Sequence, residues 1–149
     1  LVVIEAALVS DKEAALCALP GDAKFTYALW YGPSLPGSEV ASFAPGRDDF
    51  AADLAPARTF ITVEEAEGAR AAGLLAAGGE GNSVVVYPDR VSEEAALPQA
   101  FARHKLLDLI GDLFVLGRPI VGRVMGFYTG HRHNHELARR LADMQLQAH

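Results

Sequence analysis

One stretch of this sequence governs the interpretation of the rest: Phe101-Ala102-Arg103-His104-Lys105-Leu106-Leu107-Asp108-Leu109-Ile110-Gly111-Asp112-Leu113. It forms the centre of the longest predicted helix, from about Pro98 to Leu116, and its aliphatic residues are spaced to cover a wide apolar face. His104, Asp108 and Asp112 follow one another at intervals of four residues, so a helix places them on one narrow stripe. Titratable groups therefore line part of a helix that otherwise resembles a core element.

This stripe allows two interpretations. His104 and Asp108 on one helix face present a nitrogen and a carboxylate oxygen to the same cation, a ligand pair that suits zinc. The alternative, which the spacing alone favours, is a solvated stripe with an ordinary His–Asp pair. Gly111 lies beside the stripe and costs about 1 kcal/mol relative to alanine inside a helix, which indicates close packing or access for a bulky group at this point.

The segments around this helix predict strands first and then mixed helices and strands. Strands are expected at Leu1–Val9, Ala14–Leu19, Lys24–Tyr31, Glu39–Phe43, Ser83–Tyr87 and Ile120–Tyr128, the first three as an antiparallel meander. Further helices are expected at Asp48–Leu54, at Val63–Ala72 behind a Thr62–Glu65 capping box, and from His133 or Asn134 to about Gln145. This order predicts an α+β fold, a two-layer sandwich of a mostly antiparallel sheet and helices with a small βαβ-like insert.

The bulk composition excludes some classes of function. A chain of 149 residues is enough for one domain of ordinary size. Its net charge of −6 argues against broad contact with nucleic-acid backbones, although a local pocket for one phosphate group stays possible. Apolar runs such as Leu113–Leu116 and Ser83–Tyr87 are too short to span a bilayer, so we expect no stable membrane anchor.

Four segments, in the same order, resemble the UDP-3-O-acyl-N-acetylglucosamine deacetylases, a bacterial family of zinc enzymes of lipid A synthesis. They are Ala57-Arg58-Thr59-Phe60, then Gly78-Gly79-x-x-Asn82 with a valine-rich strand and Asp89-Arg90-Val91, then Phe101–Leu113, and finally Gly130-His131 with a helix containing Asn134. The resemblance covers about residues 57–144 well and the first 50 loosely. It implies that residues 1–149 are the carboxy-terminal domain of a cytoplasmic deacetylase, with an insert at about residues 83–97.

The resemblance also implies roles for individual residues. His104 and Asp108 fall on the residues that bind the catalytic zinc in that family. Lys105 falls on the lysine that contacts the diphosphate of the substrate, UDP-3-O-acyl-N-acetylglucosamine. Asp112 falls on the acid that orients the catalytic histidine, and His131 falls on that histidine.

The implied chemistry is hydrolysis of the N-acetyl group from a sugar amine. Zinc would polarise the amide carbonyl and acidify its water, and the departing amine needs a proton. His131, held protonated by Asp112, is the predicted general acid. Thr59 falls on the threonine whose hydroxyl helps to hold the oxyanion, and Phe60 would either line the acyl or sugar site or pack in the core.

The sequence departs from the family in one respect. The family's amino-terminal domain supplies another zinc-binding histidine and a glutamate base, whereas this sequence has no histidine before Ala57. The chain also opens within a predicted strand at Leu1 and lacks an initiator methionine. We expect a fragment of a complete deacetylase, with the rest of the site on a missing amino-terminal domain. The alternatives are a non-catalytic module that binds nucleotide sugars or acyl chains, and an interaction domain.

A second candidate metal motif is His131-x-His133-x-His135. On a strand the three rings would share one face. Gly130 ends the preceding strand, however, and a helix is expected from Asn134 onward, so we expect the three rings to point apart.

Overall fold

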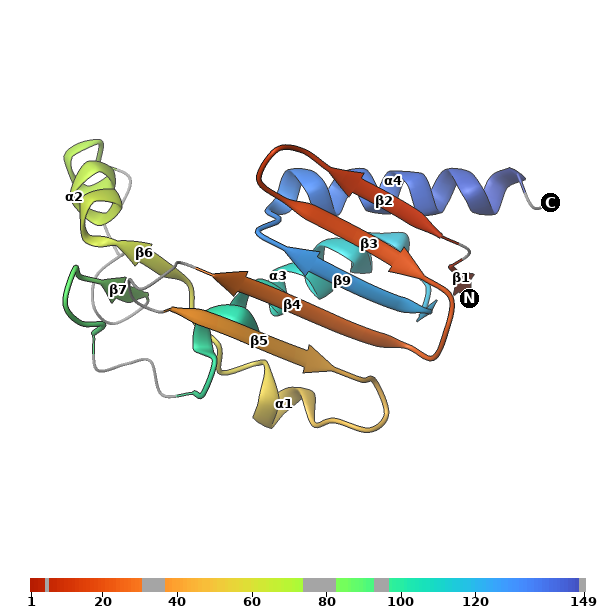
Figure 1. Ribbon diagram of the computed structural model, residues 1–149, viewed down its shortest axis with the longest axis horizontal. Helices are drawn as coiled ribbons and strands as arrows, with labels where there is room; N and C mark the ends of the chain where they lie inside the picture. Colours follow the sequence, from red (N-terminus) through yellow and green to blue (C-terminus); the bar gives the residue numbers. More distant parts are fainter. Residues whose placement is uncertain (5, 31–36, 74–82, 93–96, 148–149) are drawn as a thin grey trace.

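The main body of the structure is a five-stranded sheet with two long helices on one face (Figure 1). The computed structural model describes residues 1–4, 6–30, 37–73, 83–92 and 97–147. The strand order is β2-β3-β9-β4-β5. The strands are β2 (Ala7–Ser10), β3 (Ala15–Leu19), β9 (Arg123–Phe127), β4 (Lys24–Trp30) and β5 (Ser38–Phe43), and the two helices are α3 (Ala100–Leu113) and α4 (His131–Gln147).

The sheet is mostly antiparallel, as predicted, but the predicted meander of the first three strands is wrong. Strand β9 lies between β3 and β4, antiparallel to the first and parallel to the second. Its residue Arg123 pairs with both Leu19 and Lys24, so the turn between these two residues crosses the end of β9. Period-two alternation identifies which face of a strand is buried, but it does not identify the neighbouring strand.

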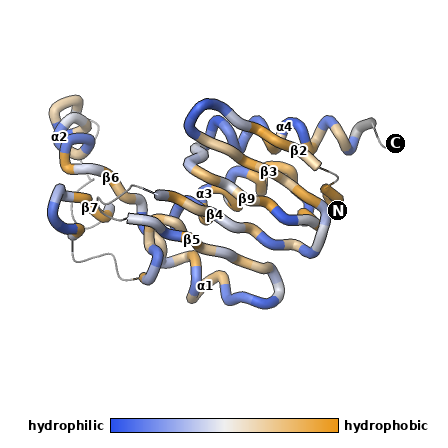
Figure 2. The backbone as a smooth tube through the Cα atoms, viewed as in Figure 1, coloured by the Kyte–Doolittle hydropathy of each residue, from blue (hydrophilic) through white to orange (hydrophobic). Residues whose placement is uncertain are grey.

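A single core lies between the sheet and the two helices, which confirms the two-layer α+β sandwich. Alternate residues of each strand face the helices, and each helix packs a row of leucines against the sheet. The fully buried residues of this core include Leu16, Tyr27, Val124, Leu106, Leu109, Leu113, Leu137 and Leu141. Each buried leucine contributes roughly 2 kcal/mol of hydrophobic stabilisation. Figure 2 shows the amphipathic character of α4, where hydrophilic and hydrophobic segments alternate along the helix.

Two predicted strands are each broken in two. The expected strand Leu1–Val9 consists of β1 (Val2–Val3) and β2, and β1 pairs in parallel with β8 (Ile120–Val121) outside the main sheet. The expected strand Ile120–Tyr128 divides into β8 and β9 at Gly122, whose φ is +152°. A Cβ at Gly122 would lie 2.8 Å from the Cβ of Ile4, so only glycine fits here.

A small βαβ unit lies at the end of the molecule away from the two termini, and of its three elements the helix and the second strand were predicted (Figure 1). It consists of β6 (Phe60–Thr62), α2 (Val63–Ala71) and β7 (Val84–Val86), with β6 and β7 parallel. Strand β6 was not expected from the sequence. The Thr62–Glu65 capping box is confirmed, with both reciprocal hydrogen bonds present. The insert boundary at about residues 83–97 stays a prediction, and the segments 78–82 and 93–96 lie outside the described residues.

The helix boundaries differ from the expected ones at points that affect the site. Helix α1 (Phe50–Asp53) is capped by Asp49, and α3 continues into a 3-10 turn, η1 (Phe114–Leu116). Helix α4 begins at His131, two residues before the earliest expected start, so His131 belongs to its first turn. None of the described helices is long and apolar enough to cross a membrane.

Candidate functional site

The polar stripe of α3 begins with a histidine–carboxylate pair that fits a metal ion. The Nε2 atom of His104 lies 3.5 Å from Oδ2 of Asp108, and the two side chains are only 14% and 19% exposed. This distance is long for an N–H···O hydrogen bond. It is close to the ~3.3 Å that separates two ligands bound at about 2.0–2.1 Å to one tetrahedral zinc ion.

The surroundings of His104 favour its neutral form, which is the form that binds metal ions. Burial is the main cause and lowers the pKa of His104, while the carboxylate of Asp108 and the backbone of Ala57 act in the opposite direction. Phe60 packs edge-on against this ring, with 6.0 Å between centroids, and also against Phe101 at 4.6 Å. Phe60 therefore has a packing role that fixes the chain beside His104.

Lys105 also reaches this carboxylate. Its Nζ lies 3.4 Å from Oδ2 of Asp108, the oxygen that faces His104, and its side chain is 27% exposed. Thr59, by contrast, is exposed on the segment before β6, and its carbonyl accepts a 2.7 Å hydrogen bond from the Val84 N–H. Thr59 directly precedes Phe60, whose ring contacts His104.

Asp112, one turn beyond Asp108, is the centre of a second cluster that links α3 to α4. Its Oδ2 accepts hydrogen bonds from Nδ1 of His131 at 2.7 Å and from Nδ2 of Asn134 at 2.8 Å, and its Oδ1 lies 3.3 Å from Nε2 of His135. Burial raises the pKa of Asp112, but the hydrogen bonds from Asn134 and His131 outweigh it, and the net effect lowers this pKa. Asp112 is therefore a carboxylate at neutral pH.

His131 stands beside both clusters. Its side chain is 64% exposed, and Nδ1 is the ring nitrogen that contacts Asp112, at 2.7 Å. His131 lies close enough to His104 for its charge to contribute to the lowered pKa of that residue. The structure thus brings together four of the residues singled out in the sequence: His104, Asp108, Asp112 and His131.

The role of Asn134 as a partner of Asp112 was missed in the sequence, although a signal was present. Asn134 is 1% exposed and lies on the buried stripe of α4 with Leu137 and Leu141. A polar residue on the apolar stripe of an amphipathic helix must find a buried partner. Asp112 is that partner.

The candidate motif of three histidines does not gather around one point. His131 and His135, four residues apart on α4, both reach Asp112, and their ring centroids are 6.4 Å apart. The expectation that all three rings point apart is therefore wrong for this pair, because the helix begins at His131. His133 faces the other way and contacts Asp11. Within the described part of the chain, no three histidine, cysteine or acidic side chains converge as a metal site.

Replacing Asp112 by asparagine is expected to lower the free energy of unfolding by about 1–3 kcal/mol at pH 7, because charged hydrogen bonds between α3 and α4 are lost. The pKa of Asp112 lies below its ordinary value of 3.8 in the folded protein, so its contribution is fully present above that pH. The contribution disappears as the pH falls through the folded-state pKa. Urea unfolding at several pH values should show a difference between wild type and D112N that is present at about pH 5 and shrinks below about pH 4. A difference that grows in acid would contradict this.

Two adjacent histidine–carboxylate pairs, His104–Asp108 and His131–Asp112, are the kind of titratable groups that hydrolases use. Residues 1–143 match the family described as UDP-3-O-acyl N-acetylglycosamine deacetylase, LpxC. The chain belongs to this family, which confirms the resemblance seen in its motifs.

Curated relatives agree with this assignment, and all of those compared carry the name UDP-3-O-acyl-N-acetylglucosamine deacetylase. The protein from Phenylobacterium zucineum (strain HLK1) is 41% identical over 135 residues, which are 89% of this chain and 45% of the relative. The protein from Chlamydia abortus (strain DSM 27085 / S26/3) is 37% identical over 134 residues, 87% of this chain and 48% of the relative. The chain thus spans about half the length of the curated relatives it matches.

Proposed function

We propose that this chain forms the carboxy-terminal part of a zinc-dependent deacetylase that removes the N-acetyl group from UDP-3-O-acyl-N-acetylglucosamine in lipid A biosynthesis. The observation that carries the proposal is the side-by-side arrangement of His104–Asp108 and His131–Asp112 in a chain of this family. The substrate is a sugar nucleotide, so the enzyme would work in the cytoplasm, without a stable membrane anchor.

In this proposal His104 and Asp108 hold the zinc ion through Nε2 and Oδ2, whose 3.5 Å separation suits one tetrahedral ion. Zinc bound there would act as a Lewis acid toward the amide carbonyl and the attacking water. A catalytic zinc site has three protein ligands as a rule. We propose that an amino-terminal domain supplies the third ligand and the general base, since the relatives are about twice as long as this chain.

His131 supplies the proton that the leaving amine requires. An amide nitrogen cannot depart as an anion, so a positioned acid must protonate it as the C–N bond breaks. The Asp112 carboxylate accepts Nδ1–H of His131 at 2.7 Å, which fixes the ring and leaves Nε2 to carry the transferred proton. The ionised Asp112 also compensates the positive charge of the protonated ring.

Thr59 and Phe60 complete the site on the side of β6. The Phe60 ring packs against Phe101 and His104, and Thr59 directly precedes Phe60 in the chain, which supports a place for Thr59 in the proposed site. The exposed Thr59 hydroxyl would donate to the oxyanion that forms at the acetyl carbon. The exposed part of Phe60 would line the sugar or acyl site.

Lys105 is the proposed contact of the substrate diphosphate. Replacing it by alanine is expected to raise KM about tenfold or more with a smaller effect on kcat, because a point charge on a phosphate stabilises the ground state and transition state alike. Lys105→Arg should keep part of the affinity. Steady-state kinetics on the full-length enzyme checks this, and an unchanged KM in K105A would remove Lys105 from the diphosphate site.

The proposed function is tested by acetate release from UDP-3-O-acyl-N-acetylglucosamine with the full-length enzyme, before and after chelation and after zinc is restored. The expected result is loss of activity on chelation and recovery with zinc. The alternative, a non-catalytic module that binds nucleotide sugars or acyl chains, predicts substrate binding without acetate release. That outcome would overturn the proposal.

A further inference from the structure

The segment that leads to His131 is held in an unusual backbone conformation. Tyr128 has a φ of +54°, which is uncommon for a residue with a large side chain. The hydroxyl of Tyr27 donates a 2.6 Å hydrogen bond to the Thr129 carbonyl, and the Tyr128 hydroxyl accepts one from the Trp30 N–H. A strained backbone persists only where its surroundings hold it in place. His131 therefore follows a segment that other elements constrain.

His133 closes this segment onto the first turn of α4. The Gly130 N–H donates a 3.2 Å hydrogen bond to Nδ1 of His133, and the His133 N–H donates to the Gly130 carbonyl at 3.0 Å. The contact of the Gly130 N–H is one half of a capping box, in which the side chain of the third helical residue reaches back to the N-cap backbone. A histidine ring takes the place that glutamate or glutamine commonly occupies.

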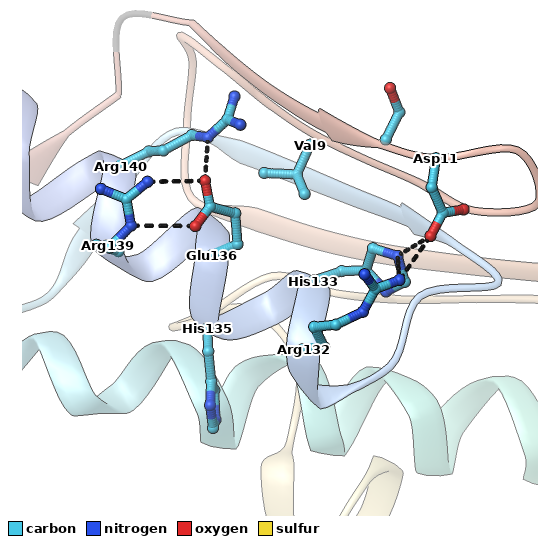
Figure 3. A pocket seen from close by; sticks show the side chains of 9 residues that line it. Val9, Asp11, Arg132, His133, His135, Glu136, Arg139 and Arg140 are labelled. Carbon is cyan, nitrogen blue, oxygen red and sulfur yellow. Dashed lines mark hydrogen bonds and ion pairs between the residues drawn. The ribbon is translucent and has the colours of Figure 1, made fainter.

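The other ring nitrogen of His133 is fixed by a residue far away in the sequence. Its Nε2 lies 2.7 Å from Oδ2 of Asp11, in the turn between β2 and β3 (Figure 3). The Asp11 side chain is itself fixed, because its Oδ1 accepts the N–H groups of Glu13 and Ala14 at 3.0 Å each. The Nη2 atom of Arg132 donates to the same Oδ2 at 2.8 Å and lies farther, at 3.3 Å, from Nε2 of His133.

These contacts determine the tautomer of His133. A backbone N–H can only donate, so Nδ1 must be the acceptor, and the proton of the neutral ring lies on Nε2. Asp11 accepts that proton, because backbone hydrogen bonds, first that from Glu13, and the contact with His133 hold the pKa of its carboxyl far below the ordinary value. His133 is only 13% exposed, so water competes little for either bond.

We propose, on the basis of the proposed deacetylase function, that His133 is a positioning residue for His131. Asp11 fixes the tautomer of the His133 ring, and the ring holds the Gly130 N–H. This contact sets where α4 begins and therefore where His131 presents Nε2. Asp112 holds His131 from α3, and the Asp11–His133 pair holds the preceding backbone from the sheet.

Three substitutions separate the roles of the two ring nitrogens. In His133→Asn the side-chain oxygen lies near the position of Nδ1 and can accept the Gly130 N–H. His133→Leu fills a similar volume but leaves the Gly130 N–H without its acceptor. In Asp11→Asn the amide oxygen keeps the Glu13 and Ala14 N–H groups, so the amide nitrogen faces Nε2 as a donor. This favours the opposite tautomer and directs an N–H of the ring at the Gly130 N–H.

The experiment measures kcat and KM of the full-length enzyme on UDP-3-O-acyl-N-acetylglucosamine, together with hydrogen exchange of the Gly130 amide. H133L and D11N are expected to lower kcat about tenfold or more, with KM within about twofold, and to speed Gly130 exchange. H133N should stay within about threefold of wild type in both measurements. The matched control is Arg139→Ala. Arg139 lines one cavity together with Asp11 and His133, but its guanidinium contacts Glu136 (Figure 3) and Asp143 instead of Asp11.

Two outcomes overturn the inference. The first is wild-type kcat and wild-type Gly130 exchange in H133L and D11N. The second is equal losses in H133N and H133L, which would mean that the acceptor at the position of Nδ1 has no role and that the ring acts only by packing. If the wild-type enzyme releases no acetate, the proposed function fails. The positioning role is then tested without activity, by hydrogen exchange of the Gly130 amide and by the ¹⁵N chemical shifts of the His133 ring, which report its tautomer.

Discussion

Replacing His104 by alanine in the full-length enzyme is expected to weaken zinc binding at least 100-fold and to lower deacetylase activity about 1000-fold or more. Loss of a partner of a metal ligand already costs about 10–100-fold in affinity, and loss of a ligand costs more. The Lewis-acid contribution of several kcal/mol is lost with the ion. Asp108→Ala should have the same two effects, because its Oδ2 is the other atom at ligand separation.

Zinc content after dialysis, measured by atomic emission, checks this result independently of activity. His135→Ala is the matched control, because His135 is a histidine of the neighbouring cluster whose Nε2 reaches Asp112 and not Asp108. It should keep wild-type zinc content. Full zinc content in H104A, or zinc loss in H135A alone, would show that the metal site lies elsewhere on the enzyme.

The placement of three polar residues on one stripe of α3 was predictable from local sequence information, whereas the role of His104 and Asp108 toward zinc stays a prediction that the family resemblance implies. Helical spacing alone places His104, Asp108 and Asp112 on one stripe, because their relative positions depend only on the helix that contains them. The structure bears out that placement: His104 faces Asp108, and Asp112 lies on the same helix toward α4. The Thr62 capping box was predictable for the same reason, since it is completed within four residues.

Features that depend on distant contacts were not predictable in this way. The position of β9 between β3 and β4 joins segments about a hundred residues apart, and no turn signal encodes it. The contact of His133 with Asp11 spans 122 residues. The shared contact of His131 and His135 with Asp112 depends on the residue at which α4 begins, and helix ends are difficult to place from sequence.

Replacing His131 by alanine or glutamine is expected to lower kcat about 100- to 10,000-fold with little change in KM, which is the usual contribution of general acid–base catalysis. The proton matters only as the C–N bond breaks, so its loss affects the transition state and not substrate binding. Zinc content should be unchanged, since His131 is bound to Asp112 and not to the candidate ligand pair. Added imidazole should restore part of the activity of H131A.

His135 provides an unusually close control for this prediction. Its side chain is 65% exposed against 64% for His131, and both rings reach Asp112. The difference lies in the contact: His131 is 2.7 Å from the carboxylate and His135 is 3.3 Å from it, at the other oxygen. Because only the shorter bond fixes a ring tightly, H135A should stay within about threefold of the wild-type kcat. Equal losses of kcat in H131A and H135A would mean that both histidines take part in proton transfer. A loss of kcat in H135A alone would assign the role of general acid to His135.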